Sequence, residues 1–177
     1  MKKQLQLLAM AVLLVAVSAC KLFTKDIEVP QKFSIQINQQ ANASQQFSTT
    51  KDVDTGSEDV RKYQDKIDDF KIDKLTFTVS NFTSSASPVV SGTLKFAVTG
   101  TTNYKTLGSV TNADLKALAG NGQEVAVAIT DEAAKNDLVT QMRGGNKVTF
   151  KLEGTTTAVP VVATMNFKIY ANMTVGL

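Results

Sequence analysis

The chain has 177 residues, of which 19 are Lys or Arg and 16 are Asp or Glu, and it contains one cysteine and no histidine. Without histidine, Ser-His-Asp and Cys-His catalytic groups and imidazole zinc sites are excluded. The formal net charge of +3 includes two lysines near the N-terminus, so the remainder is almost neutral and lacks the basic excess that nucleic-acid binding requires.

The first twenty residues have the order of a secretory signal. Lys2 and Lys3 precede an apolar run over residues 5–17, and the small residues Ser18 and Ala19 follow it. This run is shorter than the roughly 20 apolar residues that are needed to cross the core of a bilayer. We therefore expect a cleaved leader over residues 1–19 rather than a membrane span.

The leader ends in Val17-Ser18-Ala19-Cys20, which resembles the lipobox of bacterial lipoproteins, with valine where leucine is commoner. The resemblance implies cleavage before Cys20, a diacylglycerol on its thiol, and a new amino group open to acylation, as by palmitate. Two or more acyl chains hold a protein on a membrane, at about 0.8 kcal/mol per buried methylene. A buried free thiol, a catalytic thiolate and half of a disulfide are the other interpretations, and the chain offers neither a second cysteine nor a histidine for them.

The same resemblance implies a place in the bacterial cell envelope, with the membrane as partner through the lipid on Cys20. Lys21 follows the cysteine, where Asp would resemble an inner-membrane retention signal, so we expect the outer membrane, on its periplasmic or surface face. An envelope protein or a glycan would be a further partner, and nucleic acid is not expected.

In chain order, residues 20–30 are expected to form the lipidated tether, because Pro30 favours an extended chain. Residues 31–177 are expected to form a single β-rich domain. The alternation of apolar and polar residues over 33–37 predicts a strand, and a weaker strand is expected around Phe47. Apolar residues then recur at spacings of three and four, which predicts a helix with Ser57 as N-cap and an apolar stripe of Val60, Tyr63, Ile67 and Phe70.

Further strands are expected over 75–79, 94–98, 125–129, 148–152 and 161–175, the last long enough to need a bulge or bend. Two more helices are expected, one between Thr111 or Asn112 and Gly120 and one over 131–143 with Gly144 just past its end. The pattern predicts a mainly β fold, an antiparallel β-sandwich of about 7–8 strands with two or three short helices. A closed β-barrel with a ligand cavity is the alternative.

Carboxylates are the remaining source of acid-base or metal chemistry, and half of them lie between Asp52 and Asp73. The run DVDTGSED makes Asp52, Asp54 and Asp59 weak candidates for calcium. It departs from an EF-hand loop, because Gly56 is one place early and Tyr63 stands where the closing Glu belongs. Acids from Asp65 to Asp73 could serve a hydrolase, but the lysines among them are typical of a solvated surface.

Exposed aromatic rings are the last possible ligand contacts, and Tyr104 and Tyr170 are the two candidates. No phosphate-binding loop is present and no cofactor is implied. We therefore expect a non-enzymatic, membrane-anchored binding or assembly module. A carrier of an apolar ligand in a barrel cavity and a carboxylate-dependent hydrolase are the alternatives.

Overall fold

The computed structural model describes residues 24–176, so Cys20 and the lipobox lie outside the described residues. Nine strands form one sheet in the described chain. They are β1 Thr24–Glu28, β2 Gln31–Gln39, β3 Gln46–Asp54, β4 Ile67–Thr83, β5 Val89–Val98, β6 Lys105–Asp114, β7 Val125–Ile129, β8 Lys147–Thr156 and β9 Val161–Gly176. The helices are α2 Glu58–Tyr63, the 3-10 turn η1 Gln64–Lys66, α3 Leu115–Asn121 and α4 Glu132–Arg143. Every described helix is too short or too polar to cross a membrane.

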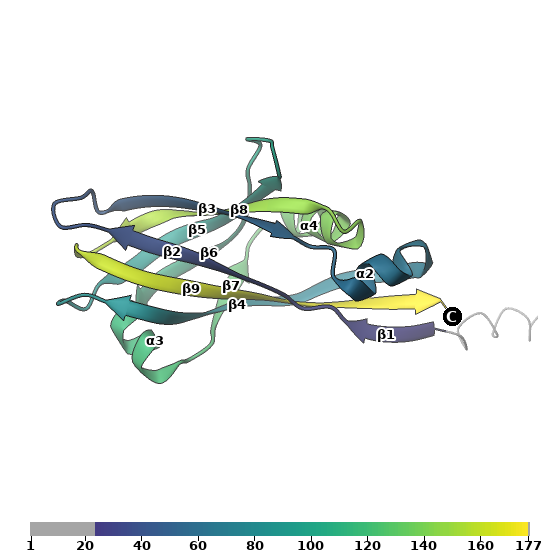
Figure 1. Cartoon of the computed structure of the whole chain (residues 1–177), viewed down its shortest axis with the longest axis horizontal. Helices are drawn as coiled ribbons and strands as arrows, with labels where there is room; N and C mark the ends of the chain where they lie inside the picture. The colour runs from purple at the N-terminus through teal and green to yellow at the C-terminus, as the bar shows by residue number, and fades with distance from the viewer. Residues whose placement is uncertain (1–23, 177) are drawn as a thin grey trace, which may run out of the picture.

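The strands lie in two antiparallel layers, which Figure 1 shows with β2, β9 and β4 running side by side. The first layer contains β1, β2, β9 and β4, and the second contains β3, β8, β5 and β6. Strand β7 joins them, because it pairs with β4 through residues 125–127 and with β6 through residues 128–129. The predicted antiparallel β-sandwich is confirmed.

Stacked phenylalanine rings fill the space between the layers. Phe33 of β2 lies 4.1 Å from Phe150 of β8 and 5.2 Å from Phe167 of β9, measured between ring centroids. Phe77 and Phe96 continue the stack on either side. These rings occupy the middle of the sandwich, where a carrier would hold its ligand.

The sheet curls without closing into a barrel. Strand β2 pairs with β9 and β3 pairs with β8. Among the described strands, no ladder joins β2 to β3, although the Gln39 side chain donates to the Gln46 carbonyl across the corner. This hydrogen-bond pattern is that of a sandwich and not of a closed barrel.

Strand β9 is the central element of the first layer. Its alternation buries eight apolar side chains, from Val161 to Val175, and leaves the intervening residues partly exposed. The expected irregularity takes the form of register shifts in the pairing of β9 with β4, and β9 itself contains no extra residue. Each shift places one extra residue in β4, which lets the longer strand curve around β9.

Those bulges explain why the predicted helix over residues 57–70 is only half correct. Helix α2 has Ser57 as its N-cap and buries Val60, as expected, but it ends at Tyr63. Ile67 and Phe70 belong to β4. A bulge between them leaves both facing the core at a spacing of three, which imitates one turn of a helix.

Two other boundaries differ from expectation and one helix agrees. The sequence predicts a tether over residues 20–30, but Thr24–Glu28 form strand β1, which pairs with β9. Helix α3 is capped by Asp114 and ends at the left-handed Gly122, not at Gly120. Helix α4 is confirmed: it has Asp131 as N-cap and Gly144 as C-cap, and it buries Ala134, Leu138 and Met142 on one face.

Candidate functional site

The outer face of the first layer carries lysines that face one another across paired strands. Lys32 of β2 is directly opposite Lys168 of β9, and Lys168 is directly opposite Thr76 of β4. Like charges in directly opposed positions repel. Among the described residues, Lys32, Lys74 and Lys168 take part in none of the ion pairs, whereas Lys95 and Lys151 both bind Glu153.

Tyr170 organises the charges next to this pair. It lies opposite Lys74 in the β4–β9 register. The ammonium groups of Lys74 and Lys168 are 4.1 Å and 3.8 Å from the centroid of its ring. Because the negative face of an aromatic ring attracts a cation, the Tyr170 ring stabilises both ammonium groups at the surface.

Glu124, just before β7, closes the cluster at its other edge. Its Oε1 accepts hydrogen bonds from the Thr76 hydroxyl at 2.5 Å and from the Tyr170 hydroxyl at 2.7 Å. The Thr76 bond, then the Tyr170 bond, and the nearby charges of Lys74 and Lys168 lower the pKa of Glu124 below its ordinary value. The carboxylate is therefore ionised at neutral pH, and the cluster contains three cations and one firmly held anion.

Two hollows open on this face on either side of Lys168, and we call them the upper and the lower hollow. The upper hollow, of about 330 Å³, is lined by side chains that include Lys32, Ser34, Thr78, Asn166 and Lys168. The lower hollow, of about 290 Å³, is lined by residues that include Glu28, Asp73, Lys74, Lys168 and Tyr170. Lys168 lines both, so the two hollows are neighbours along β9.

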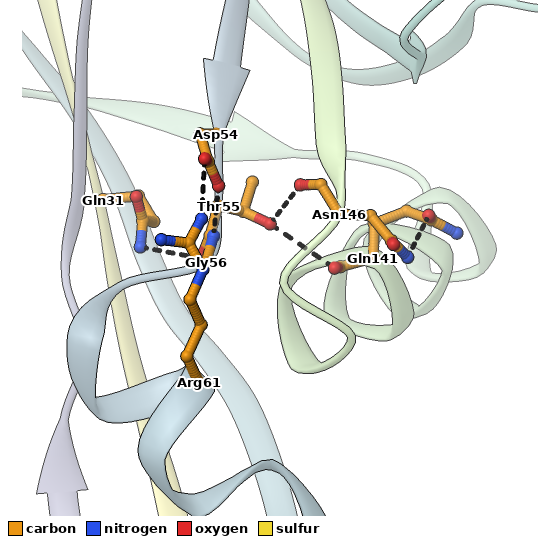
Figure 2. Close-up of polar contacts among 7 residues, drawn as sticks. All are labelled: Gln31, Asp54, Thr55, Gly56, Arg61, Gln141 and Asn146. Carbon is orange, nitrogen blue, oxygen red and sulfur yellow. Dashed lines mark hydrogen bonds and ion pairs between the residues drawn. The ribbon is translucent and has the colours of Figure 1, made fainter.

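The weak calcium candidates do not come together. Figure 2 shows Asp54 engaged by its own neighbours: its carboxylate accepts from the Gly56 amide at 2.9 Å and from the Arg61 guanidinium at 2.7 Å. The Gly56 hydrogen bond, and then Arg61, lower its pKa. Asp52 accepts from the Thr149 hydroxyl, and Asp59 is exposed on α2. In residues 24–176, no group of three acidic side chains could hold a metal ion.

The acids considered for a hydrolase lie on the surface. Asp65, Asp68, Asp69 and Asp73 are all exposed, and Asp73 accepts a hydrogen bond from the Asn172 side chain. Asp73 and Glu28 share the lower hollow, but both are exposed to water, whereas a glycosidase pair has one partly buried carboxyl group.

Of the two aromatic candidates, only Tyr170 lies within a cluster. Tyr104 immediately precedes β6 in the other layer, where the Lys151 ammonium lies 5.3 Å from the centroid of its ring. The lysines beside Tyr170 were missed because their meeting depends on strand register. Their outward positions on alternating strands were the available signal, since Lys32 and Lys168 flank inward phenylalanines.

A separate pocket of about 420 Å³ lies where β6 and β7 diverge beside α3. Phe77 and Val110 line its apolar part, while Asn112, Asn121 and Gln123 line its polar part. Some of these polar groups are already engaged locally, since the Asn121 side chain accepts from the Gln123 amide. We do not assign this pocket a role.

The comparisons with known proteins give fold-level likeness only. No family model matches the chain, and no curated protein matches it. Similar solved structures include the decameric BFDV capsid protein, which is 8% identical over 85% of this chain and 98% of its own, with a TM-score of 0.37. The capsid of Helicobacter pylori bacteriophage KHP30 is 10% identical over 87% and 99%, with a TM-score of 0.34. Tobacco necrosis virus is 12% identical over 85% and 94%, with a TM-score of 0.33. These values carry no statement about function.

Proposed function

We propose that this chain is a lipid-anchored, non-enzymatic binding module of the bacterial cell envelope, held on the outer membrane through Cys20. The observation that carries the proposal is the Val17-Ser18-Ala19-Cys20 sequence, preceded by two lysines and an apolar run. The outer face of β2, β9 and β4 supports a role in binding, because its residues Lys32, Lys74 and Lys168 form no ion pair within residues 24–176.

The position of β1 adds a geometric consequence to the anchor. Thr24 begins β1 only four residues after Cys20. Four residues of fully extended chain are at most about 14 Å long. A lipid on Cys20 would therefore place the β1 end of the domain close to the membrane. Figure 1 shows β1 and the end of β9 at one end of the long axis, and the β2–β3 and β8–β9 connections at the other. The connections would then point away from the membrane.

Metabolic labelling with an alkyne analogue of palmitate tests the anchor. In a bacterial host that processes lipoproteins, the wild-type chain should be labelled and should sediment with membranes. Cys20→Ala should lose both properties, and Ser18→Ala, which keeps the cysteine and a small residue, is the matched control. Membrane association of an unlabelled wild-type chain would contradict the proposal.

Separation of the two membranes on a density gradient tests the expected location. The wild-type chain should travel with the outer membrane, and Lys21→Asp should shift it toward the inner membrane. Protease treatment of intact cells then distinguishes the surface face from the periplasmic face. A wild-type chain found only with the inner membrane would refute the outer-membrane assignment.

The non-enzymatic part of the proposal has its own test. Purified protein should show no turnover of polysaccharides or esters above background. Robust turnover that is abolished by Asp68→Asn, Asp69→Asn or Asp73→Asn would instead establish the carboxylate-dependent hydrolase.

A further inference from the structure

We propose that the outer face of β2, β9 and β4 binds an acidic oligosaccharide, whose carboxylate lies between Lys32 and Lys168. This site is independent of the lipid anchor, because all of its residues lie on the strands of the sheet and on the segment that leads into β7. It assigns a ligand class to a surface that sequence motifs leave without one.

Two opposed lysines provide the positive charge that would bind an anion. Lys32 and Lys168 are directly opposed on neighbouring strands, and within the described chain neither has an acidic partner at ion-pair distance. An anion between the two ammonium groups would replace their repulsion with two charge-assisted hydrogen bonds. The upper hollow gives such an anion room next to both lysines.

The polar groups around the lysines are held in fixed orientations. The Ser34 hydroxyl donates to Asn166 Oδ1 at 2.8 Å, and Asn166 Nδ2 donates to the Ser80 hydroxyl at 2.9 Å. These two hydrogen bonds connect β2, β9 and β4 and orient the amide of Asn166, which lines the upper hollow. A site whose polar groups are already ordered loses less entropy when a ligand binds.

The length of the surface along β9 favours a ligand of several sugar units. The upper hollow reaches Asn166 and the lower hollow reaches Asn172. These residues are six positions apart on β9, which corresponds to about 20 Å of strand. A single small anion would fill only one part of this surface, whereas a chain of sugars could follow β9 past Lys168 into the lower hollow.

Carboxylates and lysines occur together on this face, and this mixture favours a sugar over a uniformly charged polymer. Glu124 lies at the upper hollow, and Glu28 and Asp73 line the lower one. These carboxylates would repel the regularly spaced phosphates of a nucleic acid. An acidic sugar presents hydroxyl groups that can donate to carboxylates as well as an anion that can accept from lysines.

Calorimetric titration of the full chain in detergent provides the test. A trisaccharide of galacturonic acid is the probe, and a trisaccharide of galactose is its neutral counterpart. We expect saturable binding of the acidic trisaccharide, at least about tenfold weaker binding of the neutral one, and a loss of affinity as sodium chloride is raised from about 0.05 to about 0.5 M.

Variants connect this binding to the site. Lys168→Gln and Lys32→Gln should each weaken binding of the acidic trisaccharide about tenfold, which corresponds to about 1.4 kcal/mol. Lys168→Arg keeps the charge and should retain most of the affinity. Lys51→Gln is the matched control, because Lys51 is an exposed strand lysine in the other layer, and it should bind as the wild type does. The melting temperature of each variant shows that it is folded.

Any of four results would overturn the assignment. One is the absence of binding of the acidic trisaccharide at millimolar concentration by folded protein. The second is equal affinity of the wild type for the acidic and neutral trisaccharides. The third is equal affinity of the Lys168→Gln and Lys51→Gln variants for the acidic trisaccharide. The fourth is tighter binding of oligothymidylate or of a polyglutamate peptide, which would assign the surface to a nucleic-acid or protein partner.

Discussion

Replacement of Thr55 by valine should destabilise the domain, because Thr55 holds three segments together at the end of β3. The residue is fully buried. Figure 2 shows its contacts: its hydroxyl donates to the Asn146 carbonyl at 2.6 Å, and its own carbonyl accepts from the Gln31 side chain at 3.1 Å. Valine has the same shape as threonine without the hydroxyl, so the substitution removes the bond to the Asn146 carbonyl and the longer contact of 3.4 Å with the Gln141 carbonyl, and it keeps the bond from Gln31.

The expected loss follows from the bonds that remain. An intramolecular hydrogen bond contributes about 0.5–1.5 kcal/mol net. The Asn146 carbonyl would still accept from the Thr55 amide at 3.2 Å, so it would keep one partner. We therefore expect a decrease of about 1 kcal/mol in the free energy of unfolding, or about 2–4 °C in melting temperature for a domain of this size.

Thermal unfolding of the full chain, followed by circular dichroism, measures this decrease. Thr50→Val is the matched control, because Thr50 is exposed on the same strand, and surface substitutions usually change stability by less than about 0.5 kcal/mol. A Thr55→Val protein as stable as the Thr50→Val protein would refute the assigned role of the hydroxyl.

Two further predictions concern the second layer and Glu124. A Cβ on Gly154 would overlap the Ser91 carbonyl, whereas one on Gly120 would meet nothing within 4 Å. In urea unfolding, Gly154→Ala should therefore lower the free energy of unfolding by about 1–3 kcal/mol. Gly120→Ala should raise it by about 0.5–1 kcal/mol. Equal changes in the free energy of unfolding for Gly154→Ala and Gly120→Ala would contradict this prediction. Because its pKa is lowered in the folded state, Glu124 contributes stability above its ordinary pKa of 4.5 and loses it as the pH falls through the folded value. The difference in melting temperature between the wild type and Glu124→Gln should thus narrow below pH 4.5, and a difference that stays constant would exclude this linkage.

Elements with an uninterrupted period were predictable from the sequence. The alternation of β9 from Val161 to Val175 reproduces its burial pattern residue by residue, because every second side chain of a strand faces the core. Helix α4 was equally clear, since an acidic N-cap, apolar residues at a spacing of four and a terminal glycine agree with one another.

Elements with a broken period were not predictable. Strand β4 contains bulges that shift its apolar residues to a spacing of three, and one sequence cannot distinguish such a shift from a helical turn. The candidate site depends on register in the same way. Lys32, Lys168 and Glu124 are far apart in the chain and meet only because β2, β9, β4 and β7 pair in one order, which propensity and periodicity do not specify.

The location of the site on paired strands determines how it can be tested. Lys32 and Lys168 point outward from strands whose inward residues, Phe33 and Phe167, stack in the core. Removal of the Lys32 ammonium group leaves that stack, the β2–β9 ladder and the contact of Lys168 with Tyr170 intact, and relieves a repulsion between like charges. Lys32→Gln should therefore be at least as stable as the wild type while it binds the acidic trisaccharide more weakly. Such a separation of stability from affinity is expected of a binding surface, whereas a merely structural lysine would lose stability and leave the affinity unchanged.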